Sequence, residues 1–254
     1  MNVLKRLIKK ILPETVLIHL QAADHYFNGE GEIKIIGQLC PAQCLAIDAG
    51  ANIGTYSYFL RKHARQVVAY EPNPLLARRL AQVLPDITIR NLAVSDKAGQ
   101  VVLQVPIDSA GTPQHELASI AQDFDGRTTD FPVAAITIDS EKFEGLGFIK
   151  IDVEQHEREV LRGALATIAR CRPVIMTEVS PLKYSDELPL VFKFITDINY
   201  RGWFRLNKEW LPLNTYSGRL HAAPENFGNA QKFIGGNILF FPAEHALAER
   251  GPRV

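Results

Sequence analysis

The sequence has few cysteines and no pattern of metal ligands. Its three cysteines, Cys40, Cys44 and Cys171, are too few and of the wrong parity for a disulfide framework. No second Cys or His pair stands at the spacing of a zinc site. We therefore name no metal ligands, and we expect Cys40 and Cys44 to pack as small apolar groups near the first strand.

An excess of charge is also missing, because 28 Lys+Arg balance 28 Asp+Glu in the 254 residues. Nucleic-acid binders usually carry a basic surplus that neutralises phosphates, so this balance predicts no nucleic-acid partner. No apolar run is long enough to cross a bilayer. The hydrophobic fraction of 46% is typical of a globular protein with a full core, and we expect it to be cytoplasmic.

Residues 1–12 have the pattern of a basic amphipathic helix. Val3, Leu7 and Ile11 are among apolar residues at helical spacing, with Lys and Arg between them. The segment lacks the continuous apolar stretch and the cleavage site of a signal peptide. It either makes a peripheral contact with an anionic membrane or docks on its own domain or a partner subunit, and we favour docking.

Apolar runs alternate with helical patterns along most of the chain. Strands are expected at 45–48, 67–71, 87–91, 101–105, 133–138, 148–153 and 174–178, and helices at 53–63, 75–84, 157–170 and 186–200. Such alternation predicts βαβ units and a parallel sheet. Two late strands, 203–206 and 237–241, have no long helix between them and should close the sheet as an antiparallel pair. No linker divides the chain, so we expect one domain at 42–254 after a lead-in at 1–41.

Residues 107–131 are polar and too many for an ordinary connection. Long segments of this kind are often lids or binding loops, and we expect a lid or an insertion here.

The first strand runs into a glycine-rich turn, Asp48-Ala-Gly-Ala-Asn-Ile-Gly54. Parallel α/β sheets bind ligands at the carboxyl ends of their strands. The G-x-G-x-x-G spacing of a dinucleotide site is absent, and Asp48 would repel a pyrophosphate. A carboxylate at this point suits a ligand that carries an ammonium or a sulfonium, and S-adenosylmethionine carries both.

The next two strands end in polar residues that suit a nucleoside. Glu71 follows Asp48 by 23 positions (71 minus 48), near the offset at which an acidic residue reaches ribose hydroxyls. The alternative is that Glu71 only caps the following helix. Asn91 and the backbone of Ala93 are placed to read the adenine edge.

The strand at 148–153 is followed by ionisable side chains where a substrate hydroxyl or amine would meet the methyl group. Methyl transfer requires that nucleophile, methyl carbon and sulfur be held in line, and an alcohol also gains from a general base. Asp152, Glu154 and His156 are the candidate catalytic residues, and His156 has the most suitable ordinary pKa. The alternative is that Glu154 and Glu157 cap the next helix while His156 lies on the surface.

Together these segments resemble the FkbM family of methyltransferases. The matching pieces, in the family's order, are Asp48-Ala-Gly-Ala-Asn-Ile-Gly54, Tyr70-Glu-Pro-Asn-Pro74, Asn91-Leu-Ala-Val-Ser-Asp96, Thr137-Ile-Asp139, Phe148-Ile-Lys-Ile-Asp-Val-Glu154, His156-Glu157, Val160-Leu-Arg-Gly163 and Arg172-Pro173. The resemblance implies a class I methyltransferase fold of the Rossmann-like α/β class. Its mostly parallel seven-stranded sheet is flanked by helices, and its last strand is antiparallel.

The resemblance also implies the cofactor and its ligands. Asp48, Gly50 and Asn52 would hold the methionine end of S-adenosylmethionine, Glu71 the ribose, and Asp152 the boundary of cofactor and acceptor. Similar proteins mostly methylate hydroxyl groups of secondary metabolites or glycans, so a small-molecule or glycan acceptor is expected.

One residue departs from the family pattern. Gln155 stands where the family usually has glycine, and a position that requires a positive φ would strain it. A catalytically idle Rossmann-like binding or partner module is therefore the alternative to an O-methyltransferase. A nicotinamide oxidoreductase is disfavoured by the missing glycine motif, and a nucleic-acid methyltransferase by the neutral charge.

Overall fold

The computed structural model describes residues 12–29, 31–122, 124–179, 192–206, 209–216 and 236–253. The expected N-terminal amphipathic helix falls mainly on residues outside these ranges. Residues 186–191 of the helix expected at 186–200 also lie outside them.

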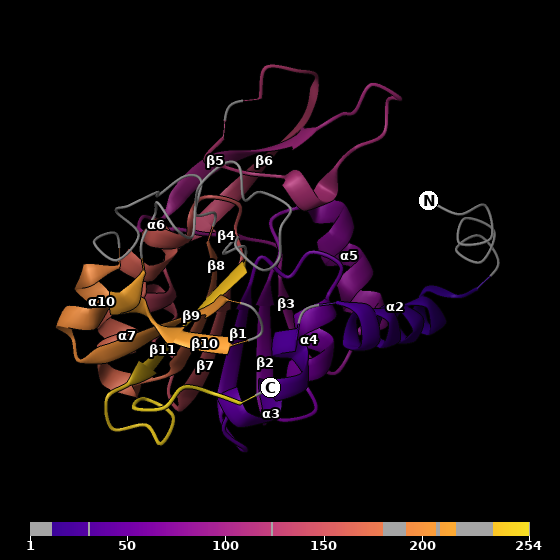
Figure 1. The fold of residues 1–254 in the computed structure, drawn as a ribbon. Helices are drawn as coiled ribbons and strands as arrows, with labels where there is room; N and C mark the ends of the chain where they lie inside the picture. The colour runs from indigo at the N-terminus through magenta and orange to yellow at the C-terminus, as the bar shows by residue number, and fades with distance from the viewer. Residues whose placement is uncertain are drawn as a thin grey trace.

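An eight-stranded sheet organises the described chain, with the order β10-β9-β11-β8-β7-β1-β2-β3 (Figure 1). Five strands form its parallel part: β1 Leu45–Ala49, β2 Gln66–Tyr70, β3 Thr88–Arg90, β7 Leu146–Ile151 and β8 Val174–Val179. β1 lies in the middle of this part, between β2 and β7. Its carboxyl end therefore lies next to the ends of both neighbours, where ligands of such sheets bind.

Antiparallel strands complete the other end of the sheet. They are β9 Tyr200–Leu206, β10 Glu209–Pro212 and β11 Gly236–Pro242. β11 pairs antiparallel with both β8 and β9, which confirms the expected antiparallel closure by the last strand. The sheet has one strand more than predicted, because β10 is a short edge strand whose four residues carry no clear alternating pattern.

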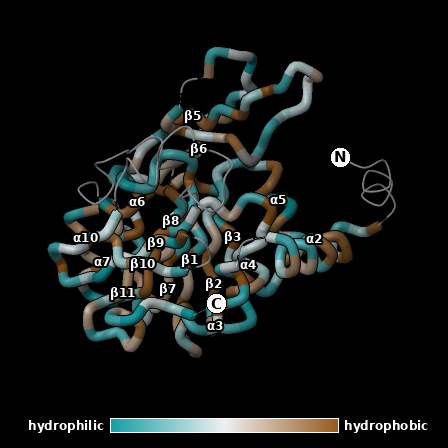
Figure 2. The backbone as a smooth tube through the Cα atoms, in the orientation of Figure 1, coloured by the Kyte–Doolittle hydropathy of each residue, from teal (hydrophilic) through white to brown (hydrophobic). Residues whose placement is uncertain are grey.

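Helices cover both faces of the sheet (Figure 1). On one face lie α2 Glu14–Asn28, a 3-10 turn Gly31–Ile35, α3 Ile36–Leu39, α4 Thr55–Leu60 and α5 Pro74–Val83. On the other lie a 3-10 turn Ile138–Glu141, α6 Glu157–Arg162, α7 Leu165–Cys171, α10 Lys193–Asp197 and a 3-10 turn Leu213–Thr215. Neighbouring residues of β1 point to opposite faces, so Ala46 packs into one core and Ile47 into the other. Hydrophobic residues accordingly gather where sheet and helices meet (Figure 2).

The helix expected at 157–170 is two helices. The chain breaks between α6 and α7 at Gly163, where a Cβ atom would lie 2.0 Å from the Ser95 carbonyl oxygen. Only glycine allows this close approach of two backbones. The break places the end of α6 against the turn after β4.

The segment 107–131, expected as a lid or an insertion, mostly connects two strands of a second sheet, and only residues 128–131 belong to a strand. This three-stranded sheet, here called the insert sheet, has the order β4-β6-β5, from β4 Ala93–Val94, β5 Gly99–Pro106 and β6 Thr128–Ile136. β6 therefore begins well before the predicted strand at 133, because residues from Thr128 onwards pair with β5. A 3-10 turn, His115–Leu117, lies in the connection that remains.

Helix α2 packs across α4 and α5. Arg79 of α5 fixes it by donating to Glu14 at 2.6 Å, to Gln21 at 3.0 Å and to the Ile53 carbonyl at 3.1 Å. One face of α2 thus lies close to the turn that follows β1. Among the described residues, no helix combines the length and apolarity needed to span a bilayer.

Candidate active site

The turn after β1 depends on a glycine that packs against the end of β7. Gly50 has a φ of 82°, and a Cβ atom there would lie 1.7 Å from the Asp152 carbonyl oxygen. The Gly50 and Ala51 amides both donate to the Tyr70 carbonyl, at 2.9 and 3.0 Å. The ends of β1, β2 and β7 are thereby held together by backbone contacts, and the side chains that follow each strand share one edge.

Asp48 lies beneath this turn and is buried. Ser57 of α4 donates to its carboxylate at 2.5 Å. Burial raises the pKa of Asp48, and the Ser57 hydrogen bond and the nearby Lys150 only partly offset this effect. A cationic ligand group in contact with Asp48 would stabilise its charged form.

Glu71 directly follows β2, two positions beyond Ala69, which is the register partner of Asp48. Its carboxylate accepts from the Asn52 amide at 2.6 Å and from the Asn73 amide at 2.8 Å. Burial nevertheless raises the pKa of Glu71 to about 7. Two backbone donors orient the carboxylate and leave it the remaining capacity to accept from a ligand.

Asn91 holds the chain after β2 in place through hydrogen bonds to its backbone. Its side-chain amide donates to the carbonyls of Glu71 and Pro72, at 2.9 and 2.8 Å. Asn91 does not line the cavities described below, whereas Ala93 does. The predicted contact of Asn91 with a ligand therefore stays a prediction, and its observed contacts position Glu71.

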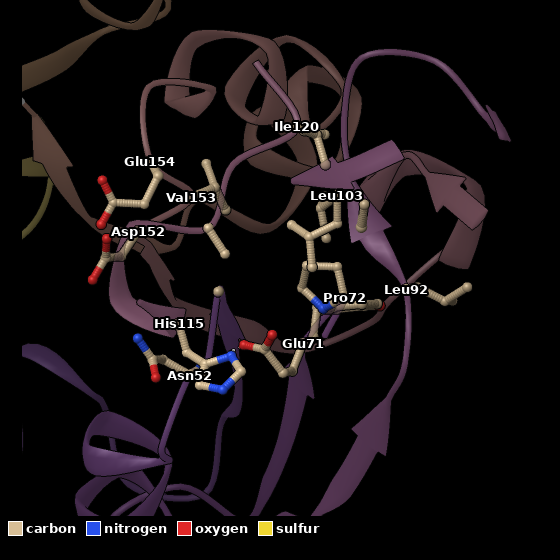
Figure 3. A pocket seen from close by; sticks show the side chains of 15 residues that line it. Asn52, Glu71, Pro72, Leu92, Leu103, His115, Ile120, Asp152, Val153 and Glu154 are labelled. Carbon is tan, nitrogen blue, oxygen red and sulfur yellow. Dashed lines mark hydrogen bonds between the residues drawn. The ribbon is translucent and has the colours of Figure 1, made fainter. Parts of the chain in front are cut away.

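Two cavities meet at this edge of the sheet. The first encloses about 630 Å³ with the open solvent at its mouth included, and its lining includes Glu71 and Pro72 after β2, Leu103 of β5, Ile120 from the connection between β5 and β6, and Val153 after β7 (Figure 3). The second encloses about 1150 Å³, again with open solvent included, and extends over Asp48 and Lys150 towards α2. Four residues line both cavities: Gly50, Asn52, Asp152 and Glu154.

An ion pair between a buried lysine and a partly exposed aspartate lies at this junction. The Lys150 ammonium is 3.1 Å from the Asp152 carboxylate, and it also lies 4.8 Å from the centre of the Tyr56 ring. Glu154 follows two residues later, and burial together with the charges of Asp152 and Glu157 raises its pKa to about 7. Asp152 and Glu154, two of the three predicted catalytic residues, are thus brought together where the cavities join.

Comparison with known proteins identifies the chain. A family model described as a methyltransferase FkbM domain matches residues 48–202, more than half of the sequence. The chain belongs to the FkbM methyltransferase family. This match confirms the resemblance seen in the sequence, and no curated protein matches the chain.

Several solved methyltransferases are similar to the chain. The FkbM methyltransferase of Methylobacillus flagellatus KT superposes with a TM-score of 0.47 at 14% identity, over 93% of this chain and 57% of that one. The chain thus spans little more than half the length of that protein. An rRNA methylase of Streptococcus thermophilus gives 0.44 at 10% identity, over 83% and 93% of the two chains. A precorrin-6y C5,15-methyltransferase of Geobacter metallireducens GS-15 gives 0.40 at 11%, over 83% and 87%.

The departure from the FkbM pattern at Gln155 falls at a strained position. Gln155 has a φ of 72°, and the preceding Glu154 has a φ of 49°. Side chains disfavour both values, whereas glycine adopts them freely. The positive φ anticipated for a position that the family fills with glycine is therefore present.

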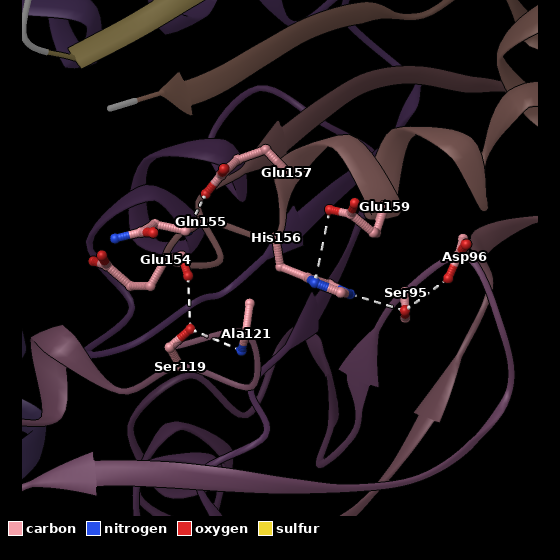
Figure 4. A network of polar contacts seen from close by, with 9 residues as sticks. All are labelled: Ser95, Asp96, Ser119, Ala121, Glu154, Gln155, His156, Glu157 and Glu159. Carbon is pink, nitrogen blue, oxygen red and sulfur yellow. Dashed lines mark hydrogen bonds and ion pairs between the residues drawn. The ribbon is translucent and has the colours of Figure 1, made fainter. Parts of the chain in front are cut away.

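His156, the third predicted catalytic residue, points elsewhere (Figure 4). Its Nε2 lies 2.9 Å from the Ser95 hydroxyl, and its Nδ1 lies 3.8 Å from the Glu159 carboxylate. It lines neither of the two cavities, and it stands at the start of α6. Its catalytic role stays a prediction, while its observed contacts join α6 to the turn after β4.

Several cavity residues carried no signal in the sequence. His115 and Ile120 come from the connection between β5 and β6, and His25 comes from α2, far from the FkbM motifs. Lys150 does carry a signal, because a lysine inside an apolar strand indicates a buried charge that needs a partner.

Proposed function

We propose that this FkbM-family protein is an S-adenosylmethionine-dependent O-methyltransferase that acts on a hydroxyl group of a small molecule or glycan. The observation that carries the proposal is the junction of two cavities at Gly50, Asn52, Asp152 and Glu154. Glu71 lies on the side of one cavity and Asp48 on the side of the other. S-adenosylmethionine joins a nucleoside and an amino-acid group through a sulfonium. Its ribose hydroxyls would lie at Glu71 and its ammonium at Asp48.

The first cavity fits the adenosine part of the cofactor. Leu103, Ile120 and Val153 give it apolar walls that suit the faces of a purine. Glu71 lies beside them with its carboxylate oriented by two amides, ready to accept from both ribose hydroxyls. Asn91 holds the chain on which this carboxylate stands.

The second cavity fits the methionine part. Asp48 would pair with its ammonium, and Gly50 and Asn52 would contact it along the turn. S-adenosylmethionine supplies an electrophilic methyl group on a sulfonium when it is bound. Asp48, Asp152 and Glu154 together make an electronegative setting for that cation, and the same carboxylates would repel a phosphate-bearing acceptor.

Glu154 is our candidate general base. It lines both cavities, and its pKa of about 7 is matched to proton transfer at neutral pH. Glu154 would take the proton of the acceptor hydroxyl, the group that the bound cofactor would methylate. Asp152, fixed by Lys150, orients the acceptor.

Cofactor binding provides the first test. Isothermal titration with S-adenosylmethionine, S-adenosylhomocysteine and NAD should give micromolar binding of the two adenosyl ligands and none of NAD. Asp48→Ala and Glu71→Ala should each weaken binding by about 1–3 kcal/mol, the scale of a charge-assisted hydrogen bond. Asp86→Ala is the matched control, because Asp86 is an exposed partner of Arg61. Unchanged affinity in both site variants would refute the site.

Turnover provides the second test and separates the enzyme from an idle binding module. Transfer of a labelled methyl group should be seen to a panel of neutral oligosaccharides and polyhydroxylated small molecules, and not to ribosomal RNA. Binding without transfer to any of them would favour the module, which the strained Gln155 makes the alternative. Transfer to RNA would refute the proposed acceptor class.

A further inference from the structure

Residues 115–120, here called the covering segment, cross the first cavity and are tied down on both sides. His115, Ala118 and Ile120 line the cavity. At one end His115 Nδ1 lies 2.9 Å from the Asn73 side-chain nitrogen. At the other end the Ser119 hydroxyl donates to the Glu154 carbonyl at 2.7 Å. The connection between β5 and β6 thus places His115 in the wall of the cavity.

The contacts of Asn73 determine which ring nitrogen of His115 carries the proton. The Leu75 amide donates to Asn73 Oδ1 at 3.0 Å, at the start of α5. This contact fixes the orientation of the Asn73 amide, so its NH₂ group faces His115. An NH₂ group can only donate, and Nδ1 must therefore accept. The proton of the neutral ring is then on Nε2.

Asn73 also connects His115 to Glu71, the residue predicted to bind the ribose. Its backbone amide donates to Glu71 at 2.8 Å, and both Glu71 and His115 line the first cavity. The same wall thus combines a carboxylate, which accepts, with an imidazole, which donates. A nucleoside presents both kinds of group, hydroxyl donors on its ribose and acceptors on its ring oxygen and base nitrogens.

We propose that His115 is a nucleoside-binding residue that donates its Nε2 hydrogen to an acceptor atom of the adenosyl group, and that Asn73 holds it in this tautomer. The inference rests on the proposed function, because it concerns the same cavity. It adds a cofactor-binding residue that lies outside the FkbM motifs. It also gives the covering segment a role in recognition.

Titration with S-adenosylhomocysteine tests the contact itself. His115→Ala should weaken binding about 3- to 10-fold, the value of a neutral hydrogen bond. Leu117→Ala is the matched control, since Leu117 lies in the same segment, is 49% exposed and does not line the cavity. Thermal unfolding of both variants should match that of the wild-type chain. Unchanged affinity in a folded His115→Ala protein would overturn the proposal.

The role of Asn73 is tested with Asn73→Asp. Aspartate still accepts from the Leu75 amide and so keeps the helix start, but it cannot donate to His115. Long-range ¹⁵N–¹H spectra should show the Nε2–H tautomer of His115 in the wild-type chain and its loss in Asn73→Asp. Wild-type His115 protonated on Nδ1 alone would overturn the assignment, even without any ligand.

A double-mutant cycle separates this effect from the added charge beside Glu71. Asn73→Asp should weaken S-adenosylhomocysteine binding in the wild-type background and have little effect in the His115→Ala background. Equal weakening in both backgrounds would show that the new carboxylate acts on Glu71 alone and would overturn the proposed tautomer control. Failure of the wild-type chain to bind S-adenosylhomocysteine would refute the proposed function first, and the nucleoside-binding role with it.

Discussion

Lys150 and Asp152 form an ion pair in which the lysine side chain has no exposed surface and the aspartate is 31% exposed. Lys150 is paired in register with Asp48 on β1, so its ammonium lies among three carboxylates of the site. Removal of such a charge leaves its partners uncompensated in a poorly solvated place. The pair therefore links the stability of the sheet to the electrostatics of the cavity.

Lys150→Met should lower the free energy of unfolding by about 2–3 kcal/mol, below the full value for a buried pair because Asp152 is partly solvated. Lys150 lowers the pKa of both Asp48 and Glu154. Its loss raises their folded-state pKa further, so the destabilisation should grow as the pH rises from 5 to 8. Urea unfolding at both pH values measures this. Lys193→Met, at an exposed ion pair, should change stability by less than about 0.5 kcal/mol; an equal loss in both variants would contradict the prediction.

Glu71 should make cofactor binding depend on pH. Its folded-state pKa of about 7 lies above the ordinary value. Its contribution to stability is therefore full below the ordinary glutamate pKa and is lost as the pH rises through about 7. Ribose hydroxyls favour the ionised carboxylate, so binding should release a proton and tighten between pH 6 and 8. Titration of S-adenosylhomocysteine in two buffers of different ionisation enthalpy measures that proton. Glu71→Gln should abolish most of the proton release. Any release that remains would come from Glu154, which is present in both proteins.

Gln155→Gly should stabilise the protein relative to Gln155→Ala by about 1 kcal/mol. An alanine at a φ of 72° retains the steric cost of the left-handed region, and glycine removes it. Glycine also loses more conformational entropy on folding, which limits the gain. Denaturant unfolding of the three proteins ranks them directly. A glycine variant less stable than the alanine variant would mean that this turn is not strained in solution.

The sequence predicts a catalytic role for His156, whereas its contacts in the structure predict that His156→Ala costs stability rather than turnover. The histidine joins α6 to Ser95 and does not line the two cavities, so its removal should lower the free energy of unfolding by about 1 kcal/mol. Glu154→Gln should do the reverse and lower kcat by about 10²–10⁴-fold with little change in cofactor affinity. Stopped assays of methyl transfer, together with urea unfolding, compare the two. A larger loss of kcat in His156→Ala would support the catalytic role that the sequence predicts for the histidine.

Local patterns in the sequence were enough to predict the parallel strands and the turn after β1. A strand such as β1 is apolar on both faces, and a glycine must follow it where Asp152 approaches. The division of α6 and α7 could not be predicted, because the reason is a contact between Gly163 and the distant Ser95 carbonyl. Similarly, the approach of His115 to Asn73 depends on the pairing of β5 with β6. The side-chain direction of His156 could not be predicted either. The sequence shows that the residue lies near the end of a strand, but not whether its ring points into the cavity.

The insert sheet has a core of its own, built from Ala93, Leu103, Val105, Val133 and Ala135, and within the described part of the chain its three strands pair with no strand of the main sheet. Such a unit can open without breaking the hydrogen bonds of the main sheet. Its amides should therefore exchange with solvent deuterium through a subglobal opening, earlier than those of β1 and β7. Because this unit supplies one wall of the first cavity, a bound nucleoside should slow that exchange. The insert sheet then acts as a cooperative folding unit whose local stability reports the occupancy of the site.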